Sequence, residues 1–207
     1  MTESNHHHGH HHAHHHVHQH TPERLEQPER VRELNPAGTL ERLNFNPNEV
    51  LCDIGAGSGL FTLAAARISQ QTVYAIDINP RMLEAIEAKA AAAGIQTIET
   101  RLVSDDTLPV PDHAADLALV ATVLHEIPDK PSFISEIRRL LKPSGRLAVI
   151  EFHAAETPMG PPVSERLGSE EVTALMISQG FKPLDQFDLS RNLYCLVFSP
   201  PAAAASV

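Results

Sequence analysis

Tryptophan is absent from this chain of 207 residues, and aromatic residues make up only 4% of it. An aromatic cage around a bound molecule is therefore not expected. The chain also lacks an apolar run long enough to span a bilayer, and its amino terminus lacks the apolar core of a signal peptide. With 42% hydrophobic and 20% charged residues, the composition predicts one globular domain in the cytoplasm, without stable membrane contact.

The chain also has few cysteines and no stripe of basic residues. Cys52 and Cys195 are the only cysteines, each lies in an apolar stretch, and they form no C-x-x-C pair. We interpret both as small buried hydrophobic residues rather than as redox centres or ligands. The 16 basic residues face 26 acidic ones, a formal net charge of −10. Because basic side chains supply most of the affinity for nucleic acid, a small molecule is favoured as the partner.

Histidine, by contrast, is concentrated at one end. Residues 1–20 contain 11 of the 14 histidines and almost no residue that packs in a core, so this tail is expected to be disordered. Neutral imidazoles bind nickel and zinc. The candidate metal ligands are His6, His7, His8, His10, His11, His12, His14, His15, His16, His18 and His20. An engineered tag and an extension without function are the alternative interpretations of the tail.

The pattern of a folded domain covers residues 21–200, and residues 201–207 form a second short tail. Pro22, Pro28 and Pro36 divide residues 22–42 into short helical pieces. Strands are expected at 49–54, 72–77, 97–102, 115–122, 146–152, 182–189 and 192–198, and helices at 60–70, 80–93, 131–141 and 169–179. This alternation predicts a Rossmann-like α/β fold with a seven-stranded, mainly parallel sheet and helices on both faces. The last two strands are so close in sequence that they form an antiparallel hairpin.

The run V-L-C-D-I-G-A-G-S-G, residues 50–59, joins a strand to a glycine-rich loop. Glycines at alternate positions allow a sharp turn and let a ligand approach the main chain closely. The next apolar stretch ends at Asp77, whose carboxylate can accept hydrogen bonds from both hydroxyls of a ribose. Asp53, two positions before the first glycine, opposes a pyrophosphate and suits a cation. The pattern therefore predicts a nucleoside cofactor that is not a dinucleotide.

This pattern resembles the class I S-adenosylmethionine-dependent methyltransferases, and the resemblance covers roughly residues 22–199. Four segments resemble the small bacterial branch related to ubiquinone and menaquinone methyltransferases: L-P-V-P-D-H-A-A-D (108–116), L-H-E-I-P-D (124–129), R-R-L-L-K-P-S-G-R-L (138–147) and E-T-P-M-G-P-P (156–162). The resemblance implies S-adenosylmethionine as cofactor and methyl transfer to a small molecule. The alternative function is metal handling by the histidine tail, with the domain as a cofactor-binding module.

The resemblance also implies a cofactor site. Its members are Asp53, Gly55, Ala56, Gly57, Gly59, Asp77, Ile78, Ser104 and Asp105. In this family Asp53 and the glycine loop lie beside the methionine portion, Asp77 holds the ribose, and Ile78 packs on the adenine. Asp105 faces the adenine amino group, with Asp106 as the alternative. The competing interpretations are a solvated turn for Asp105 and Asp106, and helix capping for Asp53 and Asp77.

A general base is needed only if the methyl acceptor carries a proton. The candidates are His125 and Glu126, directly after the fourth strand, and His153, after the fifth. A histidine with a near-neutral pKa can take a proton from a phenol, a thiol or an acidic carbon. The competing interpretation is that His125 packs against the cofactor and Glu126 caps a loop.

The loop after the fifth strand selects the substrate in this family. Met159, Arg166 and Tyr194 are therefore the candidate walls of the acceptor site. Arg166 can hold a carboxylate or phosphate, or it pairs with neighbouring surface glutamates. The sequence specifies neither the acceptor nor the oligomeric state.

Overall fold

Three short helices open the part of the chain that the computed structural model describes, residues 21–202. They are α1 (Pro22–Leu25), α2 (Pro28–Leu34) and α3 (Pro36–Arg42). Each begins with a proline, which has the helical φ angle already and lacks only an N–H that the first turn leaves unpaired. The predicted division of this region at three prolines is confirmed.

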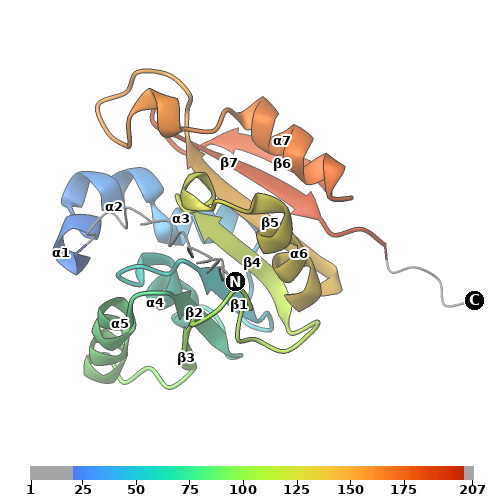
Figure 1. Cartoon of the computed structure of the whole chain (residues 1–207). Helices are drawn as coiled ribbons and strands as arrows, with labels where there is room; N and C mark the ends of the chain where they lie inside the picture. The colour runs from blue at the N-terminus through green and yellow to red at the C-terminus, as the bar shows by residue number, and fades with distance from the viewer. Residues whose placement is uncertain (1–20, 203–207) are drawn as a thin grey trace, which may run out of the picture.

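Seven strands form one sheet in the order β3-β2-β1-β4-β5-β7-β6. The strands are β1 (Leu51–Ile54), β2 (Val73–Asp77), β3 (Ile98–Leu102), β4 (Ala115–Ala121), β5 (Leu141–Phe152), β6 (Lys182–Asp188) and β7 (Leu193–Ser199). The first five pair in parallel, whereas β7 is antiparallel to both β5 and β6. The predicted mainly parallel sheet with a terminal antiparallel hairpin is confirmed (Figure 1).

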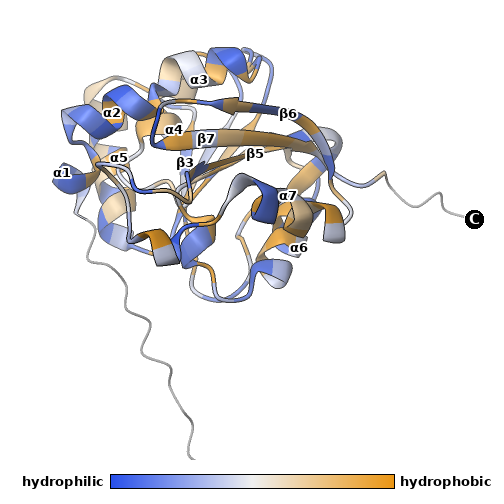
Figure 2. Ribbon diagram, turned by 90° about the horizontal axis from the view of Figure 1, so that it is seen from above, coloured by the Kyte–Doolittle hydropathy of each residue, from blue (hydrophilic) through white to orange (hydrophobic). Residues whose placement is uncertain are grey.

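Helices cover both faces of the sheet (Figure 1). The remaining helices are α4 (Leu60–Ala66), η1 (Leu124–Glu126), α5 (Pro80–Ala92), α6 (Lys130–Leu140), η2 (Val163–Glu165) and α7 (Ser169–Ser178). Side chains alternate along β4: Leu117 and Leu119 pack with α3 and α4, while Ala118 and Val120 pack with α6 and α7. Because both faces are covered, the central strands are mainly apolar, and Figure 2 shows β5 and β7 as mainly hydrophobic ribbons.

Strand β5 begins earlier than expected. The helix predicted to end at residue 141 ends at Leu140, and the strand starts at Leu141 rather than at Arg146. Leu141 pairs with Ala115, and the register then shifts before Leu117. A Cβ at Gly145 would lie 2.9 Å from the Ala115 carbonyl oxygen, so the absent side chain allows this close pairing. From the sequence alone, the Pro-Ser-Gly segment is predicted to be a loop. Its irregular strand pairing depends on the neighbouring strand β4, which the local sequence does not reveal.

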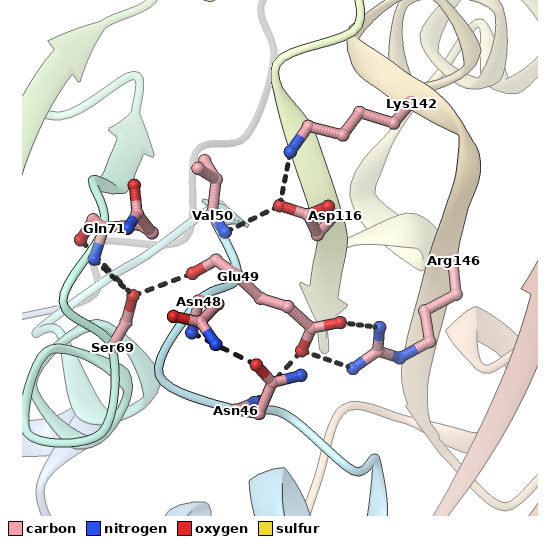
Figure 3. A network of polar contacts seen from close by, with 9 residues as sticks. All are labelled: Asn46, Asn48, Glu49, Val50, Ser69, Gln71, Asp116, Lys142 and Arg146. Atoms are coloured by element: carbon pink, nitrogen blue, oxygen red, sulfur yellow. Dashed lines mark hydrogen bonds and ion pairs between the residues drawn. The ribbon is translucent and has the colours of Figure 1, made fainter.

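A polar network ties the amino ends of β1, β4 and β5 together (Figure 3). Arg146 donates to both carboxylate oxygens of Glu49, at 2.6 and 3.0 Å, and to the Leu43 carbonyl at 3.1 Å. Asp116 accepts from Lys142 at 2.6 Å and from the Val50 N–H at 2.9 Å. These contacts fix the sheet edge opposite the carboxyl ends of the parallel strands.

The carboxyl ends of the parallel strands meet at one edge, where the strand order reverses between β1 and β4. In open α/β sheets, ligands bind at this position. The helices of residues 21–202 include none that is long and apolar enough to cross a membrane.

Candidate functional site

The glycine loop after β1 turns tightly against the end of β2. The N–H groups of Gly55 and Ala56 both donate to the Ile76 carbonyl, at 2.8 and 2.9 Å. Gly57 has a φ of 52°, in the left-handed region, and a Cβ there would lie 2.9 Å from Cδ1 of Leu25 on α1. The loop therefore presents bare main chain, and α1 lies directly beside it.

Asp77 closes β2 and orients the loop. One carboxylate oxygen accepts from the Gly57 N–H and the other from the Asn79 N–H, both at 2.8 Å. Burial raises the pKa of Asp77, while these backbone hydrogen bonds lower it, and the net shift is upward. Ile78 follows with 63% of its surface exposed, although it is a large hydrophobic residue. A carboxylate with spare lone pairs thus lies beside an open apolar side chain.

Asp53 is buried inside the sheet, with 2% of its surface exposed. The Thr62 hydroxyl, in the first turn of α4, donates to it at 2.6 Å. Burial raises the pKa of Asp53 to about 6. This geometry agrees with the helix-capping interpretation, and contact of Asp53 with a cofactor stays a prediction.

A lysine links the loop to the amino-terminal helices. Lys89 on α5 donates to the Ser58 carbonyl at 2.9 Å and forms an ion pair with Glu26, between α1 and α2. The helices beside the loop are thereby fixed to it.

Ser104, Asp105 and Asp106 lie in the exposed turn after β3. The Asp105 carboxylate accepts from the Thr107 N–H at 2.8 Å, which is the local contact expected of a solvated turn. The adenine contact predicted for Asp105 is not tested by this geometry.

His125 and Glu151 form a buried pair at the ends of two neighbouring strands. Nδ1 of His125, in η1 after β4, lies 2.8 Å from Oε2 of Glu151 on β5, and the His125 N–H donates to Oε1 at 3.2 Å. The side chain of Glu151 is fully buried and that of His125 is 7% exposed. Nε2 of His125 lies 3.8 Å from Oε1 of Glu126.

The electrostatics of this pair favour a protonated imidazole. Burial lowers the pKa of His125, but the hydrogen bond and charge of Glu151, together with Glu126 and Glu165, raise it above its ordinary value. Because Nδ1–H faces a carboxylate, the neutral ring carries its lone pair on Nε2. The pair can therefore accept a proton at Nε2.

Arg30 reaches from α2 to the turn after β4. Its Nη2 donates to the Thr122 hydroxyl at 2.8 Å, while its Nε is buried without a hydrogen-bond partner. Burial lowers the pKa of Arg30, and the charges of Glu126 and Glu151 oppose this shift. Thr122 has a φ of 57°, which is rare for a β-branched residue. A guanidinium and a strained turn thus adjoin the His125–Glu151 pair.

His153, the third candidate base, faces another direction. Its Nε2 lies 3.3 Å from Oδ1 of Asp188, at the end of β6, and its ring packs on Tyr194 at 5.4 Å between centroids. Tyr194 itself is fully buried, and its hydroxyl donates to the Leu167 carbonyl at 2.7 Å. The Tyr194 side chain is thus enclosed in the core, and its predicted place in the wall of the acceptor site stays a prediction.

Arg166 organises the loop after β5 from within. Its guanidinium donates to the carbonyls of Pro161, Ala155 and Met159, at 2.8, 2.7 and 3.0 Å, and to the Thr157 hydroxyl at 2.7 Å. Only 9% of the residue is exposed. Main-chain carbonyls and the Thr157 hydroxyl thus engage the guanidinium, and its predicted contact with a carboxylate or phosphate of the substrate stays a prediction. Met159 is half-buried in the loop that Arg166 holds.

The histidines predicted as metal ligands lie in residues 1–20, outside the described part of the chain. Within residues 21–202, no group of three or more His, Cys, Asp or Glu side chains could hold a metal ion. Cys52 and Cys195 are buried and unpaired, as expected, and burial raises the pKa of both thiols.

Three residues of this site had no role assigned from the sequence: Glu151, Arg30 and Thr122. Glu151 has a sequence signal, since it is a lone carboxylate at the end of an apolar strand. Arg30 has none, because 92 positions separate it from its partner Thr122.

Comparisons with known proteins agree with this architecture. A family model described as a methyltransferase domain matches residues 52–149. A demethylmenaquinone methyltransferase from Tropheryma whipplei (strain Twist) is 38% identical over 110 residues, which are 53% of this chain and 44% of that protein. The chain spans about half the length of the curated relatives it matches.

Solved structures share the fold. An S-adenosylmethionine-dependent methyltransferase from Aquifex aeolicus superposes with a TM-score of 0.81 at 23% identity, covering 86% of this chain and 95% of that one. The 1,6-didemethyltoxoflavin-N1-methyltransferase of Burkholderia thailandensis, solved with its substrate and S-adenosylhomocysteine, has a TM-score of 0.65 at 20% identity over 83% of this chain and 79% of that one.

Proposed function

This chain belongs to the S-adenosylmethionine-dependent methyltransferases, and we propose that it methylates a small molecule from which a proton must be removed. The observation that carries the proposal is the placement of a buried His125–Glu151 pair beside the glycine loop, at the neighbouring strand end. The geometry of the glycine loop supports a bound cofactor, and the buried histidine–glutamate pair supports a reaction that needs a base.

The residues of the loop fit an adenosyl cofactor. Asp77 is already oriented by two backbone N–H groups and retains lone pairs for two ribose hydroxyls. Ile78 offers an exposed apolar surface of the kind that an adenine ring covers. Gly57 brings bare main chain to the loop, and a Cβ there would lie 2.9 Å from Cδ1 of Leu25. When bound, the cofactor supplies an electrophilic methyl group on a positively charged sulfur.

The protein then has to position the acceptor and receive its proton. Nε2 of His125 accepts this proton, and Glu151 stabilises the imidazolium that forms, since its carboxylate faces Nδ1. Phe152 packs edge-on to the His125 ring, with centroids 6.2 Å apart, and the guanidinium of Arg166, which holds the loop after β5, lies over the Phe152 ring at 5.5 Å from its centroid. This loop is the part of the chain best placed to select the acceptor.

For the acceptor we propose a hydroxylated ring or a comparable acidic carbon compound. The name of the Tropheryma relative, a demethylmenaquinone methyltransferase, supports a ring of the quinone type. A base paired with a buried carboxylate supports the same class, because a phenolic proton must leave before the ring becomes strongly nucleophilic.

Isothermal titration calorimetry with the full-length protein tests the cofactor assignment. We expect S-adenosylmethionine and S-adenosylhomocysteine to bind and NADH not to bind. Asp77→Asn places an amide NH₂ against one of two backbone N–H groups and should abolish measurable binding.

The matched control is Asp185→Asn, on the exposed edge strand β6. It changes the same charge far from the loop and should leave the affinity unchanged. A folded wild-type protein that binds neither S-adenosyl compound would contradict the proposal.

A further inference from the structure

A groove between α7 and β6 lies at the edge of the sheet, far from the glycine loop. The glycine loop follows β1, and β4, β5 and β7 separate β1 from β6 in the sheet. We propose that this groove binds an amphipathic helix of a partner protein, with the apolar face of that helix on the groove and its basic flanks beside the acidic groove lining. Because the surface is separate from the proposed catalytic site, the inference does not depend on the proposed function.

Two adjoining hollows form the groove. Their volumes are ≈ 380 and ≈ 250 Å³, and Thr173 of α7 and Gln186 of β6 line both of them. Leu196 and Phe198, which are buried residues of β7, also line the smaller hollow. Since the hollows share lining residues on both elements, they make one groove along the outer side of α7.

Large apolar side chains are exposed at this groove. Ile177 of α7 has 53% of its surface exposed and lines the larger hollow. Leu184 of β6 has 59% of its surface exposed and lines the smaller one. Apolar side chains that share one groove give a partner a surface to bury, which a single exposed residue does not.

The side of α7 that faces the groove has the spacing of a helix-packing face. Its residues at i, i+3, i+4 and i+7 are Glu170, Thr173, Ala174 and Ile177. Val172 and Met176 belong to the buried core, so they hold the other side of the helix on the sheet. The groove side of α7 is therefore free to pack against a second helix.

The arrangement of the layers favours a helix over a strand as the occupant. Helices α6 and α7 cover one face of the sheet, and β6 is its outermost strand (Figure 1). A helix beside α7 would extend this layer over β6, at the usual distance of about 8–10 Å between packed helices. An added strand fits less well, because Pro183 has no N–H and the register of β6 shifts between Pro183 and Asp185.

The charges at the groove favour a basic partner. Glu170 lines the larger hollow and Asp185 the smaller one, and neither hollow is lined by a lysine or arginine of the described residues. Carboxylates at an interface attract a basic surface and repel an anionic lipid surface. A second copy of the chain would bring the same acidic lining to both sides of a twofold contact. A basic helix meets no such repulsion.

A synthetic amphipathic peptide tests this surface in solution. Its leucines follow the spacing i, i+3, i+4 and i+7, and lysines fill the other positions. Isothermal titration calorimetry with the full-length protein should show saturable binding, and NMR should show shifted amide signals for Thr173, Ile177 and Gln186. Two control peptides should bind at least about tenfold more weakly: one of the same composition without a single apolar face, and one with glutamate in place of each lysine.

Substitutions in the groove separate the apolar contact from the charge. The double variant Ile177→Ser, Leu184→Ser should weaken binding of the leucine–lysine peptide about 10- to 100-fold, because both side chains are exposed in the free protein and covered in the complex. Glu170→Gln should weaken binding about two- to fivefold at low salt and less at high salt. Val163→Ser and Glu41→Gln, at exposed positions outside the groove, are the matched controls and should bind the peptide as wild type does.

Unchanged binding of the leucine–lysine peptide by the double variant, or equal binding of the glutamate peptide by wild type, would overturn the inference. Either of two other occupants would overturn it as well. Dimerisation in analytical ultracentrifugation that Leu184→Ser abolishes would assign the groove to a second copy of the chain. Cosedimentation with phosphatidylglycerol vesicles that the same variant abolishes would assign it to a lipid surface.

Discussion

Nδ1 of His125 lies 2.8 Å from Oε2 of Glu151, although 26 residues separate them in the chain. The contact joins the ends of β4 and β5, which are parallel neighbours in the sheet. It makes the chemistry of His125 depend on a carboxylate that no solvent reaches.

Replacing that carboxylate should change the titration of His125. Glu151 is the main cause that raises the pKa of His125, while burial lowers it. In Glu151→Gln the effect of burial remains, so we expect the pKa to fall below its wild-type value. NMR titration of the imidazole measures this change, and Glu156→Gln, an exposed carboxylate, is the control.

The same substitution has a consequence for catalysis. A base acts in its neutral form, so activity should rise as the pH passes the pKa of His125. In Glu151→Gln this rise in the pH–activity profile should occur at lower pH. We expect the maximal rate to fall about 100-fold, because the imidazolium loses its partner. If activity rose over the same pH range in Glu151→Gln as in wild type, the result would contradict the role of the pair.

The buried carboxylate of Asp53 should lower the stability of the folded protein at high pH. Its pKa is raised from 3.8 to about 6 by burial, so the ionised form is destabilised in the folded protein above pH 6. Asp53→Asn should add about 1–3 kcal/mol to the free energy of unfolding at pH 8, since each pKa unit corresponds to about 1.4 kcal/mol.

This gain should fade as the pH falls from 6 toward 4, where the buried carboxyl group takes up a proton and is already neutral. Urea denaturation at pH 8 and pH 4 measures the difference. A gain of equal size at both values would show that the burial of charge is not its cause.

Gly57 should tolerate no side chain. Gly57→Ala places a Cβ 2.9 Å from Leu25 at a φ of 52°, and the backbone conformation alone costs about 1–2 kcal/mol. We expect weaker binding of S-adenosylhomocysteine and a lower melting temperature. The double variant Leu25→Ala, Gly57→Ala relieves the close contact and should recover only part of the loss, because the backbone strain remains.

The Glu49–Arg146 clamp should affect stability alone. Arg146→Met removes the bidentate ion pair with Glu49 (Figure 3) and a hydrogen bond to the Leu43 carbonyl, both at the amino ends of the parallel strands. We expect a loss of about 1–3 kcal/mol in the free energy of unfolding with no change in the dissociation constant of S-adenosylhomocysteine. Arg138→Met, at an exposed position of α6, controls for the change of side chain.

The sequence alone determined the order and type of the elements. Alternating apolar strands and helical periods predict the parallel sheet, and the short separation of the last two strands predicts their antiparallel pairing. The three prolines before β1 mark the helix starts, because proline fits a first helical turn and no later one. The glycine spacing and Asp77 identify the loop in the same way. A tight turn after one strand and a carboxylate at the end of the next depend on local residues, which the sequence displays directly.

Only the tertiary structure decided which side chains meet. Arg166 and Tyr194 read as surface or pocket residues, but the fold encloses both. Arg30, Thr122 and Glu151 come from three separate elements, and their approach depends on the strand order and on where α2 is anchored. A hydrogen bond over 92 positions leaves no local pattern, because its geometry is set by packing rather than by neighbouring residues.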